Sequence, residues 1–317
     1  MVKKIDALSH LVLDVGNSEF KGFVNGKAFR LLNAYEQTMG ALPHRGTEWS
    51  VFEEGFAVEL FNRPIGDCNG QFVFNPSLGE MKMADQKKED FYPLVVAGYC
   101  SIDFDAPWRV TVSHWNETKG PEIQKKLVGV HPCRVNGREG EADIREVHFM
   151  PEGQGANNVY RRNGGTGVLA ILDIGYNTVG FSLYNGNSRL KHVYEENSGV
   201  REIVRRMLQD KALQELVGYQ PAKDALLTAL INGGTLPSNS DGEGAIDIRQ
   251  FTEGYKLEWL RETLSDVHRK YGAIANKVGG FWIVGGGANI IKNAVKGTSY
   301  HVPEHPEFVN ADGMQDD

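Results

Sequence analysis

The chain has 317 residues, of which 41% are hydrophobic and 24% are charged, and its formal net charge is −7. At about 150 residues per domain this length predicts two domains, and the composition excludes a disordered or fibrous chain. The acidic balance gives no support to a broad surface for nucleic acid, so a DNA partner would be reached through an adaptor protein.

The cysteines and the N-terminal segment bear on the cellular compartment. Cys68, Cys100 and Cys133 are widely spaced and form no CxxC pair, so neither a disulfide framework nor a zinc site is expected. The apolar stretch after Ser9 is only a few residues long and is interrupted by Asp14, which argues against a signal peptide or a membrane span. We therefore expect a cytoplasmic protein without a membrane partner.

The first predicted elements form a meander of three strands. A strand of buried type ends in an Asp-x-Gly turn at residues 14–16. A second strand is predicted over 20–23, followed by an Asn-Gly dipeptide at 25–26 that suits a type I′ hairpin turn. The third strand is predicted over 27–32.

The next stretch, from about residue 42 to 151, is less periodic and is interpreted as the variable part of the first lobe. Strands are predicted over 91–96 and 108–112, and a short helix over 121–128. A further strand ends in Pro151-Glu152 and enters a helix.

The meander then recurs half a chain later. Residues 170–176 repeat the strand of buried type that ends in Asp-x-Gly, and a strand over 179–184, an Asn-Gly turn at 185–186 and a strand over 188–194 follow. Two copies of one unit predict two similar domains related by a pseudo-twofold axis, with their equivalent loops facing one cleft.

The second half continues with helices, a glycine run and a tail. Helical spacing of apolar residues predicts helices over 200–208, 222–231 and 251–271. The Gly/Ser/Asn-rich stretch 232–244 is predicted to be a loop. A buried strand over 281–284 leads into three glycines and a helix over 290–295. The tail from Pro303, with its acidic end over 312–317, is expected to be frayed.

The two Asp-x-Gly turns offer what a nucleoside triphosphate requires, namely close backbone N–H groups, a cation, and carboxylates for hydrated magnesium. Gly16 and Gly175 would let the backbone approach the phosphates, while Asp14 and Asp173 would face each other across the metal ion. Lys21 would direct its ammonium toward the phosphates. Further side-chain hydrogen bonds are expected from Asn17, Ser18, Asn177 and Thr178. One such turn is common in ordinary loops, but paired copies in matching strands favour the phosphate interpretation.

The glycine run and the Pro-Glu junction supply the remaining candidates. A bare backbone lets a flat nucleoside lie against it. The candidate residues there are Gly285, Gly286 and Gly287. Glu152 is placed to orient a water molecule on the γ-phosphate, although a carboxylate at a helix start is also favoured by the helix dipole alone. Gln154 is the second candidate for orienting this water.

The order DxGxxxxK, Pro-Glu, DxGxxT and GGGAN resembles the actin, Hsp70 and sugar-kinase superfamily, over nearly the whole chain from Leu11 to about Gly313. The compact length, Pro151-Glu152, the glycine run with Ala288, and residues 306–313 look most like the bacterial plasmid-segregation actins of ParM/StbA type. The resemblance implies an α/β actin-like fold with two duplicated RNase H-like domains around a nucleotide cleft.

This resemblance also implies domain boundaries and residue roles. Actin-like domain I would cover 1–160, with a variable insert at about 40–100, and domain II would cover 161–295. The segment 296–317 would return to domain I. The two Asp-x-Gly turns would bind the phosphates, and the Pro-Glu glutamate would activate water. Gly285 to Gly287 and Asn289 would contact the nucleoside. Tyr176 departs from the family, in which a small residue usually lies beside the phosphate.

The implied function is that of an ATPase that binds Mg-ATP, or GTP, between two lobes. It would form nucleotide-dependent filaments of its own subunits that segregate plasmid or phage DNA through an adaptor. The alternatives are a non-polymerising actin-fold scaffold that binds nucleotide, a small-molecule kinase, and a sugar- or peptide-binding module. A kinase would need an aspartate base, where this chain has Glu152, and the duplicated turns disfavour the module.

Overall fold

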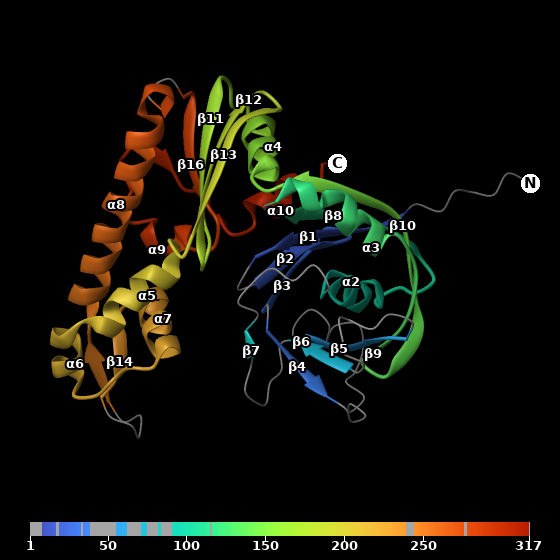
Figure 1. Ribbon diagram of the computed structural model, residues 1–317, viewed down its shortest axis with the longest axis horizontal. Helices are drawn as coiled ribbons and strands as arrows, with labels where there is room; N and C mark the ends of the chain where they lie inside the picture. Colours follow the sequence, from blue (N-terminus) through green and yellow to red (C-terminus); the bar gives the residue numbers. More distant parts are fainter. Residues whose placement is uncertain are drawn as a thin grey trace, which may run out of the picture. The chain divides into compact units, whose positions relative to one another are not determined.

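The computed structural model describes residues 8–16, 19–32, 34–38, 55–61, 71–74, 82–83, 91–114, 116–238, 244–275 and 278–316. Contacts between residues divide the chain into two compact units (Figure 1). Unit 1 comprises Met1–Asn158 and Asn310–Asp317, and unit 2 comprises Val159–Val309. These units are defined by contacts between residues, whereas the predicted domains are defined by the duplicated sequence pattern. The predicted domain boundaries therefore remain predictions.

Among its described residues, unit 1 is built on a ten-stranded sheet of order β3-β2-β1-β8-β10-β9-β5-β6-β4-β7. The strands are β1 (Ser9–Val15), β2 (Glu19–Val24), β3 (Lys27–Leu32), β4 (Ala34–Thr38), β5 (Phe56–Leu60), β6 (Gln71–Phe74), β7 (Lys82–Met83), β8 (Pro107–His114), β9 (Gly129–Val135) and β10 (Arg138–Pro151). The antiparallel meander β1-β2-β3 confirms the predicted one, and β8 and β10 extend it in parallel from β1. Figure 1 shows the long strand β10 bending between the two parts of this sheet.

Helix α2 (Tyr92–Cys100) lies inside the curve of this sheet, and all nine of its residues are buried. The Tyr99 ring lies 3.9 Å from the Phe29 ring of β3 and 5.3 Å from the Phe56 ring of β5. The prediction of a strand over 91–96 was therefore wrong. A continuous apolar run fits a buried strand and a fully buried helix equally well, and the signal for a helix was Pro93 in its first turn.

In the part of unit 2 that the structure describes, a five-stranded sheet of order β13-β12-β11-β16-β17 repeats the first five strands of the unit 1 order. Its strands are β11 (Val168–Ile174), β12 (Thr178–Asn185), β13 (Ser188–Glu196), β16 (Gly280–Val284) and β17 (Tyr300–His301). As in β3-β2-β1-β8-β10, an antiparallel meander is extended by two parallel strands. The register also repeats, because Asp14 lies opposite Lys21 and Asp173 lies opposite Gly180. This topology confirms the predicted duplication.

The remaining elements are mostly helices. Unit 1 contributes η2 (Glu117–Lys119), α3 (Gly120–Leu127) and all but the first residue of α10 (Val309–Gly313), and α4 (Gln154–Arg162) runs from one unit into the other. Unit 2 contains α5 (Val200–Gln209), α6 (Lys211–Val217), α7 (Lys223–Asn232), the hairpin β14 (Thr235–Pro237) and β15 (Ala245–Asp247), α8 (Arg249–Ala275) and α9 (Ala288–Ile291). Within the described parts of the chain, no helix combines the length and apolar character needed to cross a membrane.

Most of the predicted helices are confirmed, with two differences. Helix α9 is shorter than the predicted 290–295 element, and α6 was not predicted separately. Helix α6 has ordinary boundary signals: the Asp210 side chain accepts hydrogen bonds from the N–H groups of Ala212 and Leu213, and Gly218 ends the helix with a positive φ of 78°. Part of the predicted loop over 232–244 lies outside the described residues.

The prediction of a frayed tail was wrong, because α10 is part of the core of unit 1. Ala311 and Met314 are fully buried and pack with Val12 of β1 and Met150 of β10. The acidic composition concealed this contact, since one apolar residue in a short helix and one directly after it produce little periodic signal. A residue of α10 therefore lies beside the first Asp-x-Gly turn, as described below.

Candidate functional site

The first Asp-x-Gly turn connects β1 to β2 and is closed by a hydrogen bond from the Gly16 N–H to the Glu19 carbonyl, at 2.9 Å. A Cβ atom on Gly16 would lie 2.8 Å from the same carbonyl oxygen, which is closer than real Cβ atoms come. Only glycine therefore permits this tight turn. Asn17 and Ser18, which were predicted to contact phosphate, lie outside the described residues.

Both hydrogen bonds from described residues to the Asp14 carboxylate go to the same oxygen atom. Its Oδ1 atom accepts a hydrogen bond from the Ser113 hydroxyl at 2.5 Å and another from the Asn310 amide at 3.0 Å. Ser113 lies opposite Asp14 in the parallel β1–β8 ladder, while Asn310 comes from α10. Among the described residues Oδ2 has no hydrogen-bond partner, so this oxygen is the one available to a ligand.

Lys21 provides the cation of this turn. It lies directly opposite Asp14 in the antiparallel β1–β2 ladder, on the same face of the sheet, and only 8% of its surface is exposed. No ion pair or hydrogen bond to its ammonium is found within the described residues. The stem of Lys21 is buried, whereas its nitrogen is not among the buried side-chain atoms that lack a hydrogen bond, so the ammonium is accessible to an anionic ligand next to Asp14.

The second Asp-x-Gly turn, between β11 and β12, is built in the same way. The Gly175 N–H donates to the Thr178 carbonyl at 2.8 Å, the equivalent of the bond from Gly16. The start of α5 covers this turn, because the Val200 N–H donates to the Gly175 carbonyl at 3.2 Å and the Arg201 N–H to the Tyr176 carbonyl at 2.8 Å. The two turns thus share their internal geometry, and a helix additionally supports the second.

Two cations near the second turn were missed by the sequence interpretation. The Arg201 guanidinium donates to the Asn177 side-chain carbonyl at 3.2 Å, and the Lys223 ammonium lies 5.8 Å from the centre of the Tyr176 ring. The second meander itself has Gly180 at the position of Lys21. A signal was present in the sequence, because basic residues in the first turn of a helix oppose the helix dipole and so require a local reason.

The predicted glycine turn lies directly against the second Asp-x-Gly turn. Gly285 has a φ of +88°, and a Cβ atom there would lie 2.3 Å from Asp173 Oδ1 and 2.5 Å from the Ile174 carbonyl oxygen. The Gly287 N–H donates to the same Ile174 carbonyl at 2.8 Å. The structure thus brings Asp173 and this glycine turn together. The side chain of Asn289 donates to Glu307 at 2.8 Å.

Glu152 lies in the turn between β10 and α4, in unit 1. Its N–H donates to the His114 carbonyl at 3.3 Å, and the next residue, Gly153, has a φ of +88°. The Gly153 N–H donates to the Asn310 side-chain carbonyl at 3.1 Å. Gln154, the second candidate for orienting water, donates its amide to Asn158 at 3.0 Å. Asn310 therefore connects the Glu152 turn with the Asp14 carboxylate.

The donor set fits a hydrated magnesium ion better than a metal held by protein alone. Among the described residues, no three His, Cys, Asp or Glu side chains lie close enough together to bind a metal ion. Magnesium usually keeps several waters and takes one or two carboxylates plus substrate phosphates. Asp14, with Oδ2 available, can supply such a carboxylate, and Asp173 is the equivalent residue of unit 2.

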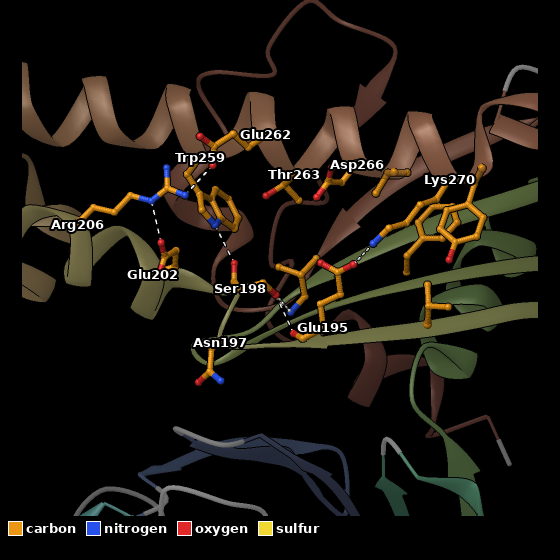
Figure 2. A pocket seen from close by; sticks show the side chains of 15 residues that line it. Glu195, Asn197, Ser198, Glu202, Arg206, Trp259, Glu262, Thr263, Asp266 and Lys270 are labelled. Carbon is orange, nitrogen blue, oxygen red and sulfur yellow. Dashed lines mark hydrogen bonds and ion pairs between the residues drawn. The ribbon is translucent and has the colours of Figure 1, made fainter.

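A separate pocket lies in unit 2, between the β12–β13 ladder and one face of α8 (Figure 2). It has a volume of about 230 Å³, and its wall includes Phe181 stacked on Tyr271, with ring centres 4.8 Å apart. Trp259 closes one end by donating to the Ser198 carbonyl at 2.8 Å. None of the predicted phosphate, metal or nucleoside residues lines this pocket, so it is not part of the candidate site.

Ion pairs along the wall of this pocket fix α5 to α8. Arg206 of α5 donates to Glu202 at 2.9 Å and to Glu262 of α8 at 2.6 Å, as Figure 2 shows. Hydrogen bonds from Arg205 and Arg206 lower the pKa of Glu202 to about 2. Because α5 also covers the second Asp-x-Gly turn, these pairs support that turn indirectly.

At neutral pH the Glu202→Gln variant is expected to unfold at a lower urea concentration than wild type, because its free energy of unfolding is lower by about 1 kcal/mol. A carboxylate with a depressed pKa stabilises the fold above its unfolded pKa, near 4.5, and loses that contribution as the pH falls toward 2. The difference between wild type and variant should therefore shrink over this range. Urea unfolding followed by tryptophan fluorescence measures it.

The control for this variant is Asp266→Asn on α8, whose side chain is 48% exposed and forms an ion pair with Arg269, which is 72% exposed. It is expected to change the unfolding midpoint less than Glu202→Gln does, because exposed pairs contribute little. A Glu202→Gln difference that stays constant down to pH 2 would assign the effect to packing instead of charge.

A duplicated sheet of this order, with an Asp-x-Gly turn after the first strand of each copy, defines the actin-like class of folds. The comparison with solved structures agrees. The crystal structure of the archaeal actin homolog Ta0583 is similar, with a TM-score of 0.76 and 15% identity over 98% of both chains. A ParM filament from Clostridium botulinum is also similar, with a TM-score of 0.71 and 14% identity over 98% of both chains.

The actin-like protein Alp7A is a further similar structure, with a TM-score of 0.70 and 13% identity over 96% of this chain and 94% of that chain. No model of a protein family matches the sequence, and no curated protein matches it. The chain therefore has an actin-like fold of the type seen in ParM proteins, as the motifs predicted. At these identities the likeness establishes the fold.

Proposed function

We propose that the chain is an ATPase that binds Mg-ATP through the Asp-x-Gly turns of both units. The observation that carries this proposal is the first turn, where Lys21, a residue that is 8% exposed, lies opposite Asp14 and its ammonium has no protein partner among the described residues. A phosphate group beside it would compensate the charge. The matching turn of unit 2 would serve the same nucleotide.

Each group in these turns would have a distinct role. The N–H groups around Gly16 and Gly175, with Lys21, would hold the phosphates. Asp14 and Asp173 would hold a hydrated magnesium ion, which supplies charge neutralisation on the phosphates when bound. The nucleoside would lie against the bare backbone of the glycine turn that begins at Gly285. In unit 2, Arg201 and Lys223 would add positive charge.

Hydrolysis would depend on Glu152, which orients a water molecule toward the γ-phosphate and takes its proton. The positive φ of Gly153 turns the chain sharply at this point, so that Glu152 precedes α4 instead of belonging to it. An archaeal actin homolog of similar fold has been solved in complex with ADP, with a TM-score of 0.73 and 14% identity. That complex supports a nucleotide as the ligand.

Nucleotide-dependent self-association in the cytoplasm, with DNA bound through an adaptor, is the proposed use of this ATPase. The similar ParM structure from Clostridium botulinum is a 15-stranded filament, which supports assembly as the property to test. The net charge of −7 favours an adaptor over direct DNA contact.

Sedimentation and light scattering after adding Mg-ATP would test this proposal, with parallel samples containing Mg-ADP, Mg-GTP and a non-hydrolysable ATP analogue. We expect filaments that pellet with the triphosphate and dissolve as it is hydrolysed. A nucleotide that binds tightly without assembly would favour the scaffold or kinase alternative. Absence of any thermal shift with Mg-ATP or Mg-GTP would exclude the nucleotide function itself.

A further inference from the structure

The side chain of Asn310 forms hydrogen bonds with two elements that are distant in the sequence. Its Nδ2 atom donates to Asp14 Oδ1 at 3.0 Å, and its Oδ1 atom accepts from the Gly153 N–H at 3.1 Å. The residue is 5% exposed, so water does not replace these bonds readily. One amide thus connects the turn after β1 with the turn before α4.

The two partners determine which way this amide faces. A backbone N–H can only donate, so the oxygen of Asn310 must face Gly153. The carboxylate of Asp14 accepts, so the NH₂ group must face Asp14. An aspartate at position 310 would keep the bond to Gly153 but would place a second carboxylate against Asp14.

Close backbone packing holds Asn310 in place. A Cβ atom on Gly155 of α4 would lie 1.9 Å from the Asn310 carbonyl oxygen, and one on Gly313 would lie 1.8 Å from the Gly155 carbonyl oxygen. The Asn158 amide also donates to the Gly313 carbonyl at 2.9 Å. Helix α10 is therefore fixed on the start of α4 independently of the Asp14 contact.

We propose that Asn310 is a positioning residue that fixes the Asp14 carboxylate and the Glu152 turn relative to each other. With Ser113 it occupies Oδ1 of Asp14 and leaves Oδ2 for the hydrated metal ion. Through Gly153 it holds the backbone next to Glu152. This role rests on the proposed ATPase function, because it acts through the residues assigned there to the metal ion and to water.

A positioning role predicts different effects on the nucleotide affinity with Mg²⁺ and on the affinity without Mg²⁺. A general loss of stability would lower both affinities together. Freeing Asp14 should weaken the contribution of Mg²⁺ to nucleotide affinity, while the affinity measured in EDTA should change little. Outer hydrogen bonds to metal-binding groups typically contribute about 10- to 100-fold to metal affinity or activity. The Asn310→Ala variant should therefore reduce the ratio of affinities with and without Mg²⁺ by about tenfold or more, and should slow single-turnover hydrolysis.

Three variants test the Asn310 hydrogen bonds to Asp14 and to Gly153 separately. Asn310→Asp keeps the acceptor for Gly153, so hydrogen exchange of the Gly153 amide should remain slow, while the Mg²⁺ effect should fall at least as far as in Asn310→Ala. Ser113→Ala, which removes the other donor to Asp14, should lower the Mg²⁺ effect without changing exchange at Gly153. Asn310→Ala should change both.

Asn158→Ala is the matched control, because it removes a hydrogen bond that docks α10 without touching Asp14. If Asn310→Ala and Asn158→Ala lose the same Mg²⁺ effect and rate, the role of Asn310 is docking alone and the proposal is overturned. If wild type binds neither ATP nor GTP, the proposed ATPase function fails instead. Hydrogen exchange of the Gly153 amide can be measured even if no nucleotide binds. If this exchange is equally slow in wild type and in Asn310→Ala, the positioning role of Asn310 is overturned.

Discussion

Replacing Glu152 by glutamine is expected to slow single-turnover ATP hydrolysis by about 10²- to 10⁴-fold, the usual contribution of a positioned general base. The amide has the shape of the carboxylate but cannot take a proton from water. The Glu152 backbone is held by the His114 carbonyl, and the Gly153 N–H by Asn310, so the turn should keep its conformation. Nucleotide affinity should therefore stay close to that of wild type.

The control for this prediction is Gln154→Ala, at the start of α4. The Gln154 amide already donates to Asn158 within the helix, so this variant should hydrolyse ATP at nearly the wild-type rate. Rapid-quench measurement with enzyme in excess over ATP separates the chemical step from product release. Equal rates for wild type and Glu152→Gln would remove Glu152 from its role, and a slow Gln154→Ala would transfer that role to Gln154.

The fold could be predicted because the same strand-turn-strand unit occurs twice in the sequence. Strand-turn-strand patterns that end in Asp-x-Gly depend only on residues close together in the sequence. Asn25 and Gly26 form the predicted two-residue turn between β2 and β3, whereas Asn185 pairs with Ser188, which moves the turn of the second copy to residues 186–187. The pairs of Asp14 with Lys21 and of Asp173 with Gly180 show that the first two strands of each meander have the same register, while the β12–β13 ladder shifts its register between Leu183 and Tyr184.

The errors occurred where burial, and not local pattern, determines the structure. Helix α2 is surrounded by the curved sheet, so it has no polar face, and its sequence resembles that of a buried strand. The tail appeared frayed because its acidic residues outnumber its apolar ones. Nevertheless Ala311 and Met314 are fully buried, and Gly313 contacts the backbone of α4.

The candidate site was predictable only in part for the same reason. Its glycines and acidic residues lie in short motifs, which can be recognised locally. The residues that orient them come from elsewhere: Ser113 from the neighbouring strand β8 and Asn310 from the other end of the chain. Such partners are defined by tertiary contacts, and a single sequence contains no signal that pairs them. Arg201 and Lys223 were the exception, since their positions at helix starts were unusual in themselves.

The Gly285→Ala variant is expected to abolish nucleotide binding and to destabilise unit 2. Gly285 has a φ of +88°, and left-handed backbone costs an alanine about 1 to 2 kcal/mol. The new Cβ atom would also overlap Asp173 Oδ1 at 2.3 Å and the Ile174 carbonyl oxygen at 2.5 Å. The backbone has little room to retreat, because the Gly285 N–H donates to the Pro306 carbonyl at 2.9 Å. Such overpacking adds about 1 to 3 kcal/mol.

Gly297→Ala separates the two causes of this effect. Gly297 has a similar φ of +82°, but a Cβ atom there would meet nothing within 4 Å. It should show only the conformational cost and should bind nucleotide like wild type. Urea unfolding and titration with a fluorescent ATP analogue measure both properties. A Gly285→Ala variant that binds nucleotide as tightly as Gly297→Ala would mean that the displaced Asp173 carboxylate is not required for binding, and the metal role assigned to Asp173 would have to be withdrawn.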